Sequence, residues 1–117
     1  MSTTVTRWRA SDGDPQLGVL RRRLEAEGMA TAWYSEVPGA VFPEHEHAFD
    51  ESRWVMAGFL QVEAAGETVV LGPGDRIDLA ARTPHRAQVL GLSPVIYVTG
   101  APAEAFPQPT GRAISAA

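Results

Sequence analysis

A series of short apolar runs that begins at Met29 restricts the possible folds more than any other feature of the chain. The runs are rich in β-branched and aromatic residues, as strands are. They are MATAWYSEV (29–37), SRWVMAGFLQVEA (52–64), ETVVLG (67–72), DRIDLA (75–80), HRAQVLG (85–91) and PVIYVTG (94–100). The segments PGAVFP, AAGE, GPGD, ARTP and GLSP separate them and carry the glycine, proline and serine typical of turns. Closely spaced strands with no helix between them predict an all-β sandwich or barrel.

The residues before this series predict one short helix. Asp14 can cap it, Pro15 suits its first turn, and Gly28 ends it. Its apolar stripe comprises Leu17, Leu20 and Leu24. We therefore expect three parts, which are an N-terminal arm and helix (1–28), a β-barrel (29–100) and an Ala/Pro-rich C-terminal tail (101–117).

Composition excludes several kinds of chemistry. The 117 residues suit one domain, and the absence of cysteine excludes disulfides, thiol nucleophiles and thiolate metal sites. All ten basic residues are arginine, so lysine Schiff-base chemistry is excluded as well. A net charge of −4 argues against nucleic acid as a partner. No apolar run has membrane-spanning length and none resembles a signal peptide, so we expect no membrane partner and a cytoplasmic location.

The histidines indicate the chemistry. There are three, and His45 and His47 are two residues apart, so on an extended strand they point to the same side. Glu51 starts the next run and can reach the same space, while His85 begins a separate strand after the ARTP turn. Three imidazole nitrogens and one carboxylate oxygen suit a divalent transition metal ion and leave one or two coordination positions open. Open positions are typical of catalytic metal sites.

The spacing of these residues resembles the first motif of the cupin superfamily. The motif is glycine, five residues, histidine, one residue, histidine, three residues, glutamate, six residues and glycine, and it is matched by Gly39, His45, His47, Glu51 and Gly58.

The second cupin motif is partly kept. Gly74, Pro84 and His85 fit it, whereas its usual internal proline, glycine and final asparagine are replaced by Ala80, Arg82 and Val89. The resemblance covers roughly residues 29 to 100.

The resemblance implies a double-stranded β-helix, or jelly-roll, barrel of about six to eight strands with a metal inside. It assigns the four ligands by position as His45, His47, Glu51 and His85. It also implies a homodimer and one divalent transition metal ion, with Fe, Mn, Ni, Zn and Cu not distinguished. The expected function is that of a metal-dependent enzyme of oxygenase, isomerase or lyase type, acting on a small organic molecule inside the barrel.

Two other functions stay open. One is a non-catalytic module that binds a small molecule or senses metal. The other is a metal-free isomerase with a histidine as base, against which Glu51 argues because it completes a ligand set.

Arg53 is a candidate substrate-binding residue. It has the same strand parity as Glu51, so its guanidinium can face the barrel interior and bind a substrate carboxylate. A β-bulge near Glu51 would instead turn it to solvent. Trp54 has the opposite parity, which favours a packing role.

Overall fold

The computed structural model of the protein describes residues 3–106 and contains nine strands, one α-helix and two short 3₁₀ helices. The strands are β1 (Thr3–Thr6), β2 (Ala30–Glu36), β3 (Val41–His45), β4 (Glu51–Ala57), β5 (Phe59–Ala64), β6 (Glu67–Leu71), β7 (Arg76–Leu79), β8 (His85–Leu90) and β9 (Val95–Ala101). The helices are η1 (Ala10–Asp12), α1 (Leu17–Ala26) and η2 (Ala103–Ala105). The predicted all-β fold with one short N-terminal α-helix is confirmed.

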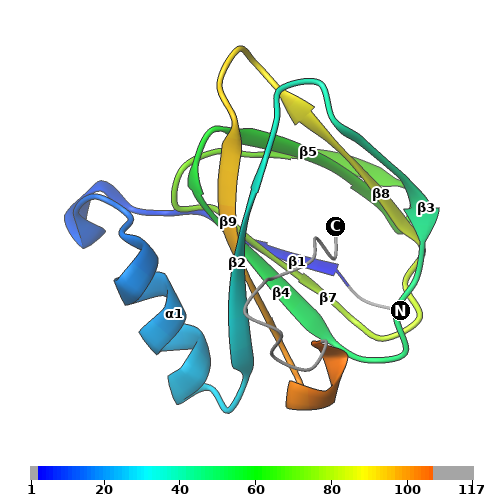
Figure 1. The fold of residues 1–117 in the computed structure, drawn as a ribbon, viewed down its shortest axis with the longest axis horizontal. Helices are drawn as coiled ribbons and strands as arrows, with labels where there is room; N and C mark the ends of the chain where they lie inside the picture. The colour runs from blue at the N-terminus through cyan, green and yellow to red at the C-terminus, as the bar shows by residue number, and fades with distance from the viewer. Residues whose placement is uncertain (1–2, 107–117) are drawn as a thin grey trace.

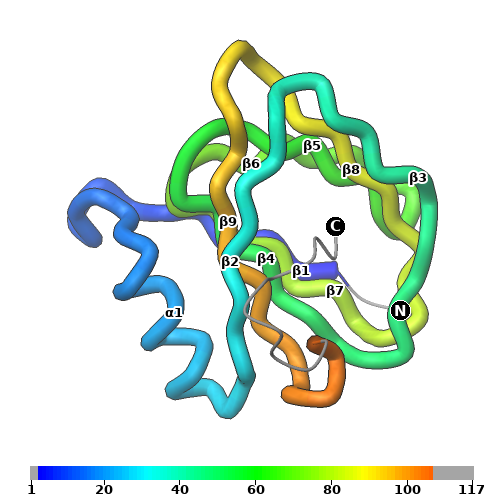
Figure 2. Tube along the Cα trace, in the orientation of Figure 1, coloured from blue at the N-terminus to red at the C-terminus, as the bar shows by residue number. Residues whose placement is uncertain are grey.

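The strands form two antiparallel sheets that face each other. The five-stranded sheet has the order β1-β7-β4-β9-β2, and the four-stranded sheet has the order β3-β8-β5-β6. Figures 1 and 2 show β3, β5 and β8 on one side of a common centre, with β1, β4 and β7 on the other. This arrangement is the predicted double-stranded β-helix.

Gly58 is the point at which the chain passes from one sheet to the other. The apolar pattern alone predicted a single strand over 52–64, which was wrong, because β4 ends at Ala57 and β5 begins at Phe59 in the other sheet. The turn that the cupin resemblance implies at Gly58 is confirmed. Gly58 has φ +79°, and a Cβ placed there would lie 2.5 Å from the Pro94 carbonyl oxygen. Only glycine adopts this conformation readily and fits this close approach.

The segment PGAVFP also holds more strand than expected. Its glycine and prolines predict a turn, but β3 begins within it at Val41. Pro43 is tolerated because β3 is an edge strand of the four-stranded sheet, where a missing backbone N–H costs little.

Apolar side chains from both sheets fill most of the interior. The buried residues of this core are Tyr34, Val55, Leu60, Val62, Ala64, Leu71, Ile77, Leu79, Ala87, Val89, Val95 and Tyr97. The inward positions of β4 continue from Val55 through Arg53 to Glu51, so one end of the interior is polar. The polar end lies where β4 and β8 begin.

Helix α1 covers the outer face of the five-stranded sheet (Figure 1). Its fully buried residues Leu20 and Leu24 pack against Trp54 and Val98, which confirms the predicted stripe and the packing role of Trp54. The predicted cap was wrong, because the N-cap residue is Gln16 and no side chain caps the helix.

The first residues contribute a strand that the sequence did not reveal. Residues 1–13 were expected to form an arm, yet β1 pairs with β7 at the edge of the five-stranded sheet. A four-residue strand is too short to show a period in the sequence. At the other end, the predicted tail starts with the last residue of β9 and η2, and residues 107–117 lie outside the described part. Within residues 3–106, no helix is both long and apolar enough to cross a membrane.

Candidate metal centre

The four predicted ligands come from three strand ends and one loop. His45 ends β3 and pairs in register with His85, the first residue of β8, while Glu51 is the first residue of β4. His47 was expected on the same strand as His45, but β3 ends before it and it lies in the loop to β4. The Arg82 backbone N–H donates to the His47 carbonyl at 2.7 Å and so connects this loop to the one that precedes His85.

Backbone carbonyls orient two of the imidazoles. Nδ1 of His45 lies 2.8 Å from the Pro43 carbonyl oxygen, and Nδ1 of His85 lies 2.9 Å from that of Thr83. A carbonyl oxygen only accepts hydrogen bonds, so each Nδ1 carries the proton and each Nε2 keeps its lone pair. A metal ligand requires that tautomer.

The three histidines form a cluster that can hold a metal ion. One ring nitrogen from each of His45, His47 and His85 lies within 4.8 Å of the others. Two nitrogens on one ion lie at most about 4.2 Å apart, because each bond is about 2.1 Å long, so small side-chain movements would close the set. His45 Nε2 is buried and has no hydrogen-bond partner among residues 3–106. A buried nitrogen with an unused lone pair is costly unless something positive binds it, so the residues fit a metal.

Glu51 lies beside this cluster and is 3% exposed. Its Oε1 atom lies 3.5 Å from His47 Nε2 and 3.4 Å from His85 Nε2. The same oxygen accepts a hydrogen bond from Arg53 Nη2 at 3.1 Å. The carboxylate is therefore shared between the histidines and a guanidinium, and its role as a ligand stays a prediction.

Arg53 points into the interior and is fully buried. The bulge that would have turned it to solvent does not occur there, because the register shift of β4 lies between Val55 and Ala57. Its Nη2 atom lies 3.1 Å from Glu51 Oε1 and 3.3 Å from His85 Nε2. Its role in binding a substrate carboxylate is untested and stays a prediction.

The environment keeps His85 neutral. Burial lowers the pKa of its imidazole from 6.5 to about 4, and the positive charge of Arg53 adds to this effect. The Thr83 carbonyl and Glu51 act in the opposite direction but do not overcome burial. At neutral pH, His85 therefore offers a lone pair without first losing a proton.

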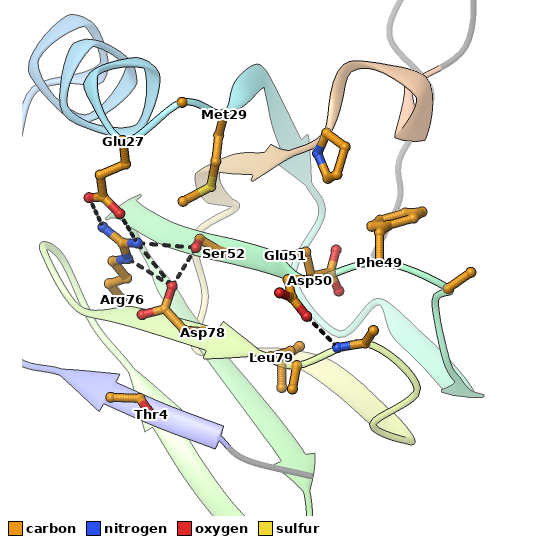
Figure 3. A pocket seen from close by; sticks show the side chains of 15 residues that line it. Thr4, Glu27, Met29, Phe49, Asp50, Glu51, Ser52, Arg76, Asp78 and Leu79 are labelled. Atoms are coloured by element: carbon orange, nitrogen blue, oxygen red, sulfur yellow. Dashed lines mark hydrogen bonds and ion pairs between the residues drawn. The ribbon is translucent and has the colours of Figure 1, made fainter.

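A pocket lies beside the start of β4. It has a volume of about 720 Å³ and is lined by residues of β1, β4 and β7, by the segment that follows α1 and by the loop that precedes β4 (Figure 3). Its polar side chains pair with one another, since Arg76 donates to Glu27 at 2.6 and 2.8 Å and to Asp78 at 3.0 Å. None of the three histidines lines it, but Glu51 does, so the pocket adjoins the histidine cluster at that residue.

Comparison with protein families agrees with the geometry. Residues 33–99, more than half of the chain, match the family model described as Cupin domain. The chain belongs to the cupin family. No curated protein sequence matches this cupin.

Solved structures show the same fold. A cupin 2 domain-containing protein from Halorhodospira halophila is similar with a TM-score of 0.69 and 19% identity over 88% of this chain and 77% of the other. KdgF from Halomonas sp. has a TM-score of 0.57 and 28% identity over 63% of this chain and 69% of its own. The DMSP lyase DddQ from Ruegeria pomeroyi DSS-3 has a TM-score of 0.58 and 23% identity over 65% of this chain, but only 39% of its own length is matched. At such identities the Halorhodospira and Ruegeria proteins support the fold alone.

Three contacts of this centre were missed from the sequence. The Pro43 and Thr83 carbonyls that orient the imidazoles belong to the backbone, which residue types do not reveal. Each stands two residues before its histidine, and that recurrence is the only signal that the sequence offers. The third contact is the parallel stacking of Phe49 on His47, with ring centroids 5.1 Å apart.

Proposed function

We propose that this cupin is a metal-dependent enzyme that acts on a small organic molecule, with a reaction of oxygenase, isomerase or lyase type. In this proposal His45, His47, Glu51 and His85 hold one divalent transition metal ion. The observation that carries it is the buried Nε2 of His45, which lacks a hydrogen-bond partner within residues 3–106 and lies in a cluster of three imidazoles.

A metal ion in this position would supply a Lewis acid or a redox centre, with open positions for a ligand. The chain itself contributes two properties. Backbone carbonyls fix the tautomers of His45 and His85, and burial keeps His85 neutral. Both reduce the reorganisation that ligand binding requires.

The low pKa of His85 also argues against the form of the metal-free alternative in which His85 is the base. A general base works best when its pKa lies near the working pH. A value of about 4 makes His85 a weak base at neutral pH, although the same neutral imidazole is a good metal ligand.

Metal content tests this proposal. Protein purified, stripped with a chelator and reloaded with Fe²⁺, Mn²⁺, Ni²⁺, Zn²⁺ or Cu²⁺ should retain about one ion per chain after desalting. His47→Ala should lose most of that ion, because one of three imidazoles is removed. Glu46→Gln is the matched control, since it changes an exposed neighbour of His47 and should retain the ion. Wild-type protein that retains none of these ions would contradict the proposal.

Turnover separates an enzyme from a binding module. A panel of small organic acids, incubated with the loaded protein, should yield at least one product whose formation is lost in His47→Ala. Retention of a small molecule without any conversion would favour the non-catalytic alternative.

A further inference from the structure

The contact between Arg53 and His85 has a consequence for metal binding. Arg53 Nη2 lies 3.3 Å from His85 Nε2. Because His85 Nδ1 carries the proton that is donated to the Thr83 carbonyl, Nε2 is an acceptor, and the guanidinium N–H donates to it. An imidazole Nε2 has one lone pair in the ring plane, which either accepts this hydrogen bond or binds a metal.

The second contact of Arg53 involves the other charged member of the centre. The same Nη2 atom lies 3.1 Å from Glu51 Oε1, and both side chains are almost completely buried. A guanidinium cannot lose its proton near neutral pH, so its positive charge stays in the interior. Without a metal it balances the charge of Glu51. The positive guanidinium would repel a divalent cation held by Glu51 and the histidines.

We infer that Arg53 competes with the metal ion, an inference that rests on the proposed metal site. Until a cation displaces it, the guanidinium of Arg53 donates to the lone pair of His85 and neutralises the charge of Glu51. Arg53 therefore lowers the affinity of the centre for divalent ions. Metal binding requires the guanidinium to leave His85 Nε2, and the released N–H group would then be available to an anionic ligand.

Chelator competition at one fixed pH measures this effect. Wild type, Arg53→Met and the control Arg86→Met are each titrated with Zn²⁺ and with Ni²⁺ against a chromophoric chelator. Methionine keeps much of the volume of arginine without its charge or donors. Arg53→Met should bind at least about tenfold more tightly, which corresponds to about 1.4 kcal/mol. Arg86 follows His85 in sequence, is exposed and pairs with Glu63. Its replacement removes one positive charge from the outside of the barrel, so the affinity for the metal ion should change less than threefold.

A double-mutant cycle locates the competition. In a Glu51→Gln background, Arg53→Met should still raise affinity, because the lone pair of His85 is released there too. Loss of the gain in that background would overturn the competition at His85. Unchanged or weaker binding by Arg53→Met in the wild-type background would overturn the inference as a whole.

Other outcomes are equally decisive. Thermal unfolding checks that the variants are folded, and Arg53→Gln replaces Arg53→Met if that protein does not fold. If wild type binds the ions and the variant binds no better, only the competition is wrong. If neither protein binds any ion, the metal site and the inference fail together. Binding by the variant alone would support the competition strongly.

Discussion

Replacing Gly58 by alanine tests how the chain passes between the two sheets. An alanine at φ +79° would adopt a left-handed conformation, which costs about 1–2 kcal/mol. Its Cβ would also lie 2.5 Å from the Pro94 carbonyl oxygen and 2.8 Å from Val95 Cα. Both are backbone atoms that cannot rotate away, and such overpacking costs about 1–3 kcal/mol. The lower entropy of the unfolded alanine chain returns about 0.4–1 kcal/mol. The free energy of unfolding should therefore fall by about 1–5 kcal/mol, with a central value of about 3 kcal/mol.

Gly39→Ala is the matched control. Gly39 has φ +80°, almost the same as Gly58, but nothing lies within 4 Å of an added Cβ. It should lose only the conformational part, about 1 kcal/mol. Urea unfolding followed by tryptophan fluorescence measures both, since Trp54 is buried between α1 and the sheet. Equal losses in the two variants would refute the claim that close approach, and not φ alone, requires glycine at position 58.

Three further predictions concern the turns and the acid stability. Arg82 has φ +66° at the position where the second cupin motif has glycine, so Arg82→Gly should raise the free energy of unfolding by about 0.5–1 kcal/mol in urea. Ala65 and Gly66 have φ +51° and +78° in the two-residue loop between β5 and β6, so Ala65→Asn, which suits such a turn, should raise the melting temperature. The pKa of His85 is lowered from 6.5 to about 4 in the folded protein, so the unfolded chain takes up this proton at a higher pH than the folded chain does. Stability is therefore lost as the pH falls from 6.5 towards 4. In this pH range the free energy of unfolding of the metal-free protein should fall by at most about 1.4 kcal/mol per pH unit because of His85. His85→Gln should make the free energy of unfolding depend less on pH between 6.5 and 4.

Much of the fold could be predicted from the sequence because its signals are local. Alternation and turn residues placed β6, β7, β8 and β9 to within about two residues, which is usual for strand ends. The apolar pattern does not show the split at Gly58, because it continues across that residue unchanged, and only the cupin motif indicated a turn there. The close approach that requires glycine there involves Pro94, which lies thirty-six positions away in the sequence.

The candidate site could be predicted to a similar degree. Spacing identified His45, His47 and His85, and the structure brings them together. The sequence did not reveal that Arg53 would contact His85, because β4 and β8 belong to different sheets and no sequence period relates them. Strand parity placed Arg53 inside correctly, but side-chain length and charge pairing decide where its guanidinium ends.

The central claim is that the three histidines bind one cation. A crystal grown with Zn²⁺ or Co²⁺, with data collected at that metal's absorption edge, tests it most directly. The account predicts one strong anomalous peak inside the barrel, about 2.0–2.2 Å from Nε2 of His45, Nε2 of His85 and a ring nitrogen of His47. A fully loaded crystal whose ion lies elsewhere, with His85 Nε2 still bonded to Arg53, would contradict it.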